Sequence, residues 1–284
     1  MKHFVFVLLV TPFLAYSQVW SPDGTKIAFF YLHAIEDIYS VNPDGTGFEI
    51  VDGHPDRDFG PQWSPDGRSL VFTSIRDGHH EIYRLDIAVG RATKLTNTEF
   101  DSESASYSPD GRSIAFASNR DGNKELYIME AEGGNIRRLT STPGPETTPR
   151  WSPNGGLILF RRAADQESAA NLFAINPATA EEHQITNIPN GAFHQSWSPD
   201  GTQICFVSAT EGAFEIHLIS VQGGEHKVLV RKEGFQAFYP AWSPDGREIA
   251  FTRDVMQGTA EGYPALYAID MNGNERLITS ENSF

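Results

Sequence analysis

The chain is poor in cysteine and in positive charge. Its one cysteine, Cys205, lies between Ile204 and Phe206, which excludes a disulfide within the chain and is typical of a buried, inert thiol. Lysine and arginine together number 22 against 37 aspartates and glutamates, so the net charge is −15. Because contacts to phosphate groups need cations, this balance argues against nucleic acid or an anionic membrane surface as the main partner.

Several motifs of catalysis and cofactor binding are also missing. The chain has no Gly-X-Ser-X-Gly nucleophile turn. The glycine pairs at 133–134 and 223–224 have the pattern of hairpin turns rather than of a phosphate-binding loop, and no stretch has the period of an amphipathic helix. We therefore expect no cofactor.

The chain does contain a repeat. An aromatic residue is followed by Ser-Pro-Asp-Gly, or by a one-residue variant, six times at intervals of 43 to 46 residues. The copies begin at Trp20, Trp63, Tyr107, Trp151, Trp197 and Trp242. In the fourth copy Asn154 replaces the aspartate, and asparagine tolerates the same geometry. Proline, aspartate and glycine in this order suit a tight turn, so we interpret the turns as structural.

Each repeat is expected to form a four-stranded antiparallel meander. An apolar run such as 69–73 follows the turn and is typical of a strand buried on both faces, and an alternating run such as 81–85 comes next. The last run, such as 136–140, carries charges that suit an exposed edge, and the short segment ending in the aromatic residue is the innermost strand. Six such sheets arranged radially cover one another's apolar faces. The sequence therefore predicts an all-β, six-bladed β-propeller, with a linear β-solenoid as the competing architecture.

The first residues have the pattern of a secretory signal. A basic start at 1–3 precedes the apolar residues 4–10, and 15–17 reads Ala-Tyr-Ser, a small-X-small cleavage site. The apolar run is too short for a membrane span, so we expect no membrane insertion after the signal is removed. We predict a signal peptide at 1–17 and a propeller at 18–284, located in the periplasm or secreted.

A second interpretation of the same residues stays open. Thr11-Pro12 precedes Trp20 by as many positions as Thr142-Pro143 precedes Trp151. Residues 5–10 would then supply an outer strand and close the ring with strands from both ends of the chain. If the signal is removed instead, the ring closes by packing between blades alone.

The repeats resemble the propeller of the TolB family, periplasmic proteins of the Tol–Pal system. The resemblance rests on Trp-Ser-Pro-Asp-Gly, an apolar strand, Glu-Leu/Ile-Tyr and a terminal Arg-Leu-Thr, best seen in 118–122, 125–127 and 138–140. It implies a propeller that binds protein in the cell envelope. We do not expect the α/β domain that precedes the propeller in TolB, nor the hydrolase domain that accompanies the same repeat in prolyl-oligopeptidase-like enzymes.

A ligand face is expected opposite the uniform turns, where the long and varied connections surround the mouth of a central channel. Apolar rings would stack there on a peptide or glycan, while charged groups orient it. The alternative is that each arginine ties its blade to a neighbour's acid and that the rings pack within the channel. The candidate ligand-binding residues are Asp58, Phe59, Arg76, Glu103, Arg120, Glu146, Arg161, Arg162, Phe193, His194, Phe238 and Tyr239.

We expect an exported, non-enzymatic propeller that binds a protein or peptide segment of the cell envelope, with a glycan as the second ligand class. The alternative is a polysaccharide lyase or hydrolase at the same mouth. Asp58 with Glu103 or Glu146 would then be the acid–base pair, or His54, His80 and His194 would converge on a metal. The histidines lie in different repeats without ligand spacing, so we assign no metal site.

Overall fold

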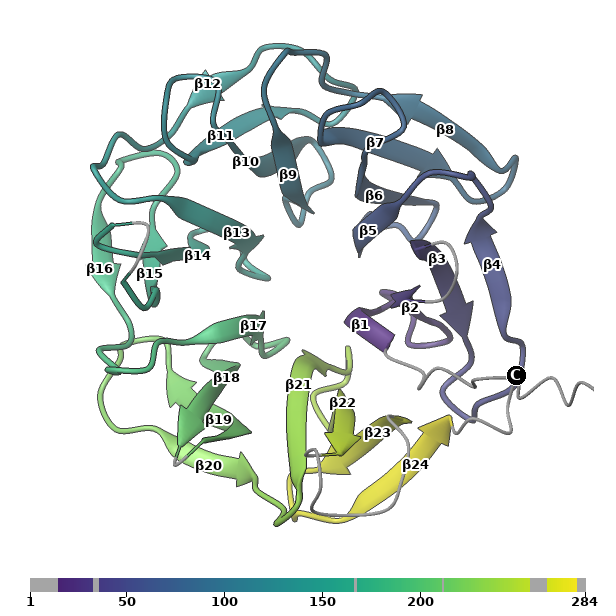
Figure 1. Cartoon of the computed structure of the whole chain (residues 1–284), viewed down its shortest axis with the longest axis vertical. Coiled ribbons are helices and arrows are strands. Elements are labelled where there is room, and N and C mark those ends of the chain that lie inside the picture. The colour runs from purple at the N-terminus through teal and green to yellow at the C-terminus, as the bar shows by residue number, and fades with distance from the viewer. Residues whose placement is uncertain (1–14, 33–35, 166–167, 211, 256–264, 280–284) are drawn as a thin grey trace, which may run out of the picture.

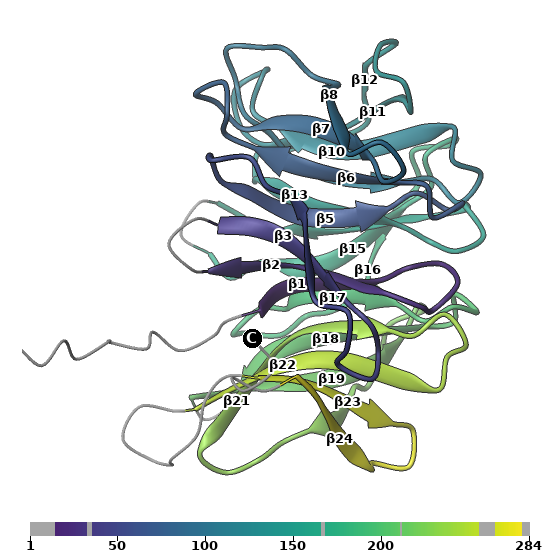
Figure 2. The same cartoon turned by 90° about the vertical axis from the view of Figure 1, so that its right-hand side faces the viewer.

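Six four-stranded antiparallel sheets surround a common axis in the computed structural model, which describes residues 15–32, 36–165, 168–210, 212–255 and 265–279 (Figure 1). Within each sheet the strands are adjacent in chain order, so every blade is a meander. The blades are numbered 1 to 6 in chain order. Figure 2 shows the ring edge-on, with the strands running across its thickness. The predicted six-bladed β-propeller is confirmed. The described residues form strands and turns, and none of them belongs to a helix that could cross a membrane.

Four rings of strands follow one another from the channel outward. The innermost strands are β1 (Ala15–Trp20), β5 (Asp58–Trp63), β9 (Ser102–Tyr107), β13 (Glu146–Trp151), β17 (Phe193–Trp197) and β21 (Phe235–Trp242). The second ring is β2 (Ile27–Leu32), β6 (Ser69–Ser74), β10 (Ser113–Ser118), β14 (Ile158–Arg162), β18 (Gln203–Thr210) and β22 (Glu248–Val255). The third ring is β3 (Glu36–Val41), β7 (Glu81–Asp86), β11 (Glu125–Glu130), β15 (Asn171–Ile175), β19 (Ala213–Ser220) and β23 (Ala265–Asp270). The outer edge is β4 (Glu49–Asp52), β8 (Arg91–Lys94), β12 (Arg137–Arg138), β16 (Glu182–Gln184), β20 (Lys227–Val230) and β24 (Glu275–Thr279).

The hydrophobic core lies between neighbouring blades. Each second-ring strand contributes one fully buried phenylalanine: Phe29, Phe72, Phe116, Phe160, Phe206 and Phe251. A typical cluster joins Val71 and Ile82 of blade 2 to Tyr107 and Phe116 of blade 3. Burying one such ring contributes about 2 kcal/mol, and only the next blade can supply the covering surface. Cys205 is buried in this core, as predicted, and its burial raises the pKa of the thiol.

The six Ser-Pro-Asp-Gly turns share one hydrogen-bond pattern. In the second copy the Ser64 hydroxyl donates to Asp66 Oδ1 at 2.7 Å and accepts the backbone N–H of Ser69 at 2.9 Å. The glycine that follows, Gly67, has a φ of +70°, where any side chain would be strained. Asn154 accepts the equivalent bond from Ser152 at 2.8 Å, so the fourth copy keeps the turn.

These turns also pack on one another around the axis. A Cβ atom placed on Gly67 would lie 3.8 Å from Pro22 of the preceding turn, and the same contact recurs from Gly111 to Pro65 at 3.8 Å. The contact between Gly24 and Pro244, at 3.9 Å, joins the first copy to the last. The turns therefore form a closed ring at one face, which agrees with their structural interpretation.

Blades 1 and 6 close the propeller without sharing a described strand. Gln18 Nε2 donates to Thr252 Oγ1 at 2.6 Å, and Trp20 Nε1 donates to the Ala241 carbonyl at 3.2 Å. Residues 5–10, the alternative closing strand, lie outside the described residues. The signal peptide stays a prediction. A cut after Ser17 would shorten β1, because Ala15 pairs with Tyr31 of β2.

Candidate functional site

The inner strands line a central channel with a volume of about 400 Å³. Three residues before each aromatic, the backbone adopts a left-handed conformation, at Ser17, Gly60, Ser104, Thr148, His194 and Tyr239, with φ between +50° and +64°. Every one of these positions falls where the register to the second strand shifts, as in a β-bulge. Five of the six are not glycine, and each of those costs about 1 kcal/mol. Bulges re-aim side chains, and the five side chains at these positions line the channel.

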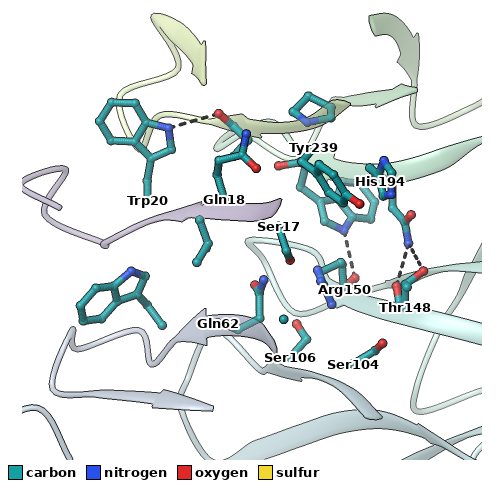
Figure 3. Close-up of a pocket in the computed structure, with 18 of the residues that line it drawn as sticks. Ser17, Gln18, Trp20, Gln62, Ser104, Ser106, Thr148, Arg150, His194 and Tyr239 are labelled. Atoms are coloured by element: carbon teal, nitrogen blue, oxygen red, sulfur yellow. Dashed lines mark hydrogen bonds between the residues drawn. The ribbon is translucent and has the colours of Figure 1, made fainter. Parts of the chain in front are cut away.

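The channel wall mixes aromatic rings with hydroxyl and amide groups, and it carries no carboxylate among the described lining residues. Ser17, Gln62 and Ser106 face the same space as the guanidinium of Arg150 (Figure 3). Arg150 is the one lining residue in the described set that is charged at neutral pH. An acidic protein therefore encloses a channel whose described lining carries one cation and no acid.

Arg150 has no ion-pair partner within the described part of the chain. Its Nη1 donates to the carbonyl of Pro149, its own neighbour, at 2.9 Å. Burial lowers the pKa of this guanidinium to about 10. A cation in this setting is unusual, because buried charges are normally paired.

Arg161 and His194 lie at the channel mouth. Arg161 Nε donates to the Ala192 carbonyl at 2.9 Å, and its Cζ lies 4.7 Å from the ring centroid of Phe193. The His194 ring lies 3.8 Å from that of Tyr239, and its buried Nδ1 has no hydrogen-bond partner among the described residues. Burial, with the charges of Arg161 and Arg150, lowers the pKa of His194 to about 3, so it is neutral at pH 7.

Three phenylalanines form an aromatic cluster beside these groups. Phe214, on β19, lies 5.0 Å from Phe238 and 6.3 Å from Phe193, measured between ring centroids. We call Phe193, Phe214 and Phe238 the mouth aromatic cluster. The rings are half-buried and pack against the core between blades 5 and 6. Aromatic faces beside unpaired guanidinium groups suit a ligand that is partly apolar and partly anionic.

The acidic residues predicted for the site are each bound by a basic side chain. Asp58 accepts from Arg76 at 2.7 Å, and the same guanidinium group reaches Asp52 of blade 1 at 2.9 Å. Glu103 accepts from Lys124 at 2.6 Å and contacts His80 of blade 2 at 3.2 Å. In blade 4, one side chain, Arg162, binds both Glu146 and Glu182, each at 2.6 Å. These carboxylates therefore hold loops and blades together and do not face one another as a free pair.

The predicted arginines divide into different roles. Arg76 joins blade 1 to blade 2, as the tie interpretation expected, whereas the contacts of Arg162 stay within blade 4. Arg120 also stays within its own blade, where it donates to Ser102 Oγ at 3.2 Å and lies 4.8 Å from the ring centroid of Tyr127. Phe59 packs edge-on against His80 at 5.3 Å. The structure thus groups Arg161, Phe193, His194, Phe238 and Tyr239 at one side of the mouth.

The histidines do not gather around a common point. His80 is bound to Glu103, and His194 stacks on Tyr239. In the described ranges, no three histidine, cysteine, aspartate or glutamate side chains lie together as metal ligands.

Sequence reasoning missed Arg150 and the hydroxyl groups of the wall. A signal was present at the position directly before each aromatic residue. The six repeats have Val19, Gln62, Ser106, Arg150, Ser196 and Ala241 there, and a single charge among neutral residues marks the arginine.

Comparisons with known proteins agree with this architecture. The family model of the TolB beta propeller domain matches residues 5–187 and 148–283. The Tol-Pal system protein TolB of Alcanivorax borkumensis is 42% identical over 64 residues, which are 22% of this chain and 15% of that protein. The chain covers less than a third of the length of the curated relatives that it matches.

Two solved structures share the fold. TolB from Acinetobacter baumannii aligns with a TM-score of 0.72 and 19% identity, over 93% of this chain and 62% of that one. Oligogalacturonate lyase from Vibrio parahaemolyticus aligns with a TM-score of 0.65 and 15% identity, over 95% and 80%. Because the family model matches most of the sequence, the chain belongs to the family of TolB beta propeller domains.

Proposed function

We propose that this chain is an exported binding propeller that takes an extended peptide segment of a cell-envelope protein into its channel mouth. The observation that carries the proposal is the preformed channel of about 400 Å³, within the range of ligand pockets, with an aromatic cluster at its entrance. Membership in a family that includes a Tol-Pal system protein supports a protein ligand in the envelope.

The channel wall suits a peptide in particular. Peptide N–H and C=O groups need partners when they leave water, and the hydroxyl and amide groups of Gln62, Ser104 and Ser106 both donate and accept. The mouth aromatic cluster offers apolar contact to side chains of the same segment. The backbone of the channel wall is strained at the positive-φ positions of the inner strands, as expected of a site whose side chains are held in place for binding.

A selection from a random library of 12-residue peptides tests the proposal. The wild-type protein should enrich peptides, and Gln62→Trp, which fills the channel from β5, should lose them. Arg112→Gln is the matched control, because Arg112 is exposed on the opposite face of the ring. A library that yields no binder, or peptides that bind Gln62→Trp equally well, would contradict the proposal. Cleavage of oligogalacturonate with formation of an unsaturated product would favour the lyase function instead.

Export is tested separately. Mass analysis of the exported protein should find an N-terminus at or near Gln18. Protein that accumulates inside the cell with Met1 retained would contradict the proposed location.

A further inference from the structure

We propose that the channel recognises a carboxylate of the bound peptide through Arg150, with Arg161 attracting the same group at the mouth. This inference rests on the proposed function, because it names the chemical group that the bound segment must present.

The distribution of charge is the first observation. Aspartate and glutamate outnumber lysine and arginine by 37 to 22, yet the described channel lining contains an arginine and no acid. A random distribution of side chains on so acidic a protein would place carboxylates in the channel first. A cation without an acidic neighbour attracts a small anion that reaches the interior of the channel.

The second observation is that other arginines near the blade seams are paired. Arg76 binds two aspartates, Arg162 binds two glutamates, and Arg253 binds Glu275. Acids thus hold three of these guanidinium groups, whereas Arg120 is held by the Ser102 hydroxyl and lies over the Tyr127 ring. Arg150 and Arg161 have no carboxylate neighbour in the parts of the chain that the structure describes.

The third observation concerns the donors that remain. A guanidinium group has five N–H donors in a planar fork that matches a carboxylate. Arg150 uses Nη1 for the Pro149 carbonyl, and Arg161 uses Nε for the Ala192 carbonyl. The remaining donors of each group can bind a carboxylate through two parallel hydrogen bonds.

His194 provides an independent sign of a missing ligand. It stands close enough to both arginines for their charges to act on it, and its buried Nδ1 lacks a partner among the described residues. Such a group normally finds a hydrogen-bond partner in the folded state. A ligand lying between the two arginines would meet this ring, and its carboxylate would offset their charge.

The ligand is expected to carry one acid in a mostly neutral or apolar segment. The surface charge repels polyanions such as nucleic acid, and the mouth aromatic cluster favours apolar neighbours. An aspartate or glutamate side chain and a free C-terminus both present a carboxylate to the guanidinium group of Arg150. The test below distinguishes these two sources.

The peptides selected by the wild-type protein carry the test. We expect one position to be enriched in aspartate or glutamate, or binding that is lost when the C-terminus is amidated. Calorimetry should show that Arg150→Gln weakens the best peptide at least about tenfold, with Arg150→Lys intermediate and Arg112→Gln unchanged. Replacing the peptide acid by its amide should cost as much in the wild type, and little more in Arg150→Gln. Urea unfolding of each variant confirms that it is folded.

The outcomes separate the two proposals. If no peptide is selected, both fail. If peptides bind without an enriched acid, or bind Arg150→Gln as tightly as wild type, the carboxylate inference is wrong and the peptide-binding function stands. If only oligogalacturonate binds, and does so through Arg150, the carboxylate belongs to a glycan and the inference for peptides is overturned.

Discussion

The arginine between blades 1 and 2 and the arginine in the channel lie in opposite electrostatic surroundings. Arg76 is held by Asp52 and Asp58, and all three side chains are largely withdrawn from water. Arg150 is half-buried in the channel wall, and the described lining around it offers hydroxyl, amide and ring groups without an acid. The same side chain thus serves to hold blades together in one region and stays available in the other.

The difference has an energetic consequence. Removing one member of a buried ion pair leaves the partner charge without compensation, which costs more than the pair itself contributes. Removing an unpaired, half-buried cation such as Arg150 relieves a desolvation penalty and leaves no partner behind. The comparison therefore predicts stability changes of opposite sign, and sites that trade stability for function show this pattern.

The largest expected effect comes from neutralising each arginine in turn. Arg76→Gln should lower the free energy of unfolding by about 3 kcal/mol, because Asp52 and Asp58 lose their counter-charge. Arg150→Gln should leave it unchanged or raise it. Urea unfolding at pH 7.5 measures both. Equal losses in the two variants would show that Arg150 also has a structural role and would abolish the contrast.

The second prediction concerns Asp37, which is close enough to Asp52 and Asp58 for their charges to act on it. Burial, then the charges of Asp58 and Asp52, raise the pKa of Asp37 from its ordinary value of 3.8 to about 6. Above pH 6 the folded protein must hold Asp37 in its charged form, which lowers the free energy of unfolding. This loss disappears as the pH falls from about 6 to about 4. Asp37→Asn should raise the free energy of unfolding by about 2 kcal/mol at pH 7.5 and by little at pH 4.

Asp110, in a Ser-Pro-Asp-Gly turn, is the control for that substitution. Hydrogen bonds from Ser108 and the backbone of Arg112 lower its pKa, so it contributes stability above its unfolded pKa that is lost in acid. Asp110→Asn should therefore not stabilise the protein at pH 7.5. A gain as large as that of Asp37→Asn would contradict the assignment.

His194, which lies beside Arg150 and Arg161, should make the stability of the protein depend on pH in a different range from Asp37. The folded pKa of His194, about 3, lies below the ordinary histidine value of 6.5. Wild-type stability should fall as the pH drops from about 6.5 toward 3, because the unfolded chain binds the proton first. Arg150, Arg161 and the rings of Phe193, Phe238 and Tyr239 surround this group. His194→Asn should remove about 1 kcal/mol of that loss at pH 5, and an unchanged pH profile of unfolding would show that His194 titrates normally.

The smallest effect compares the ring of turns with the ring of bulges within blade 3. Gly111 and Ser104 both have a positive φ, +70° and +60°. Gly111→Ser should cost about 1 kcal/mol, since a side chain is strained there, whereas Ser104→Gly should change stability by less. A large loss for Ser104→Gly, measured by thermal unfolding, would mean that this hydroxyl is structural.

The architecture could be predicted because it repeats. Six copies of one turn, each with the same apolar strands, leave a radial arrangement as the economical way to cover every sheet. The position of a residue relative to its aromatic also placed Phe193, His194, Phe238 and Tyr239 on the inner strands. The roles of the charged residues were harder to predict from the sequence. Arg76 pairs with Asp52 of the neighbouring blade, and no local sequence pattern indicates that pairing.

The sequence by itself determined the repeated blade, the number of blades, the turn geometry and the acidic surface, since each depends on residues close together in the chain or on composition. Tertiary structure alone decided which cations meet acids and which do not. These ion pairs form between long side chains that can come from different blades. Whether a cation is compensated therefore depends on which side chains the fold brings close to it. Arg150 became a candidate site residue only when five other strands were seen around it without an acid among their described lining residues.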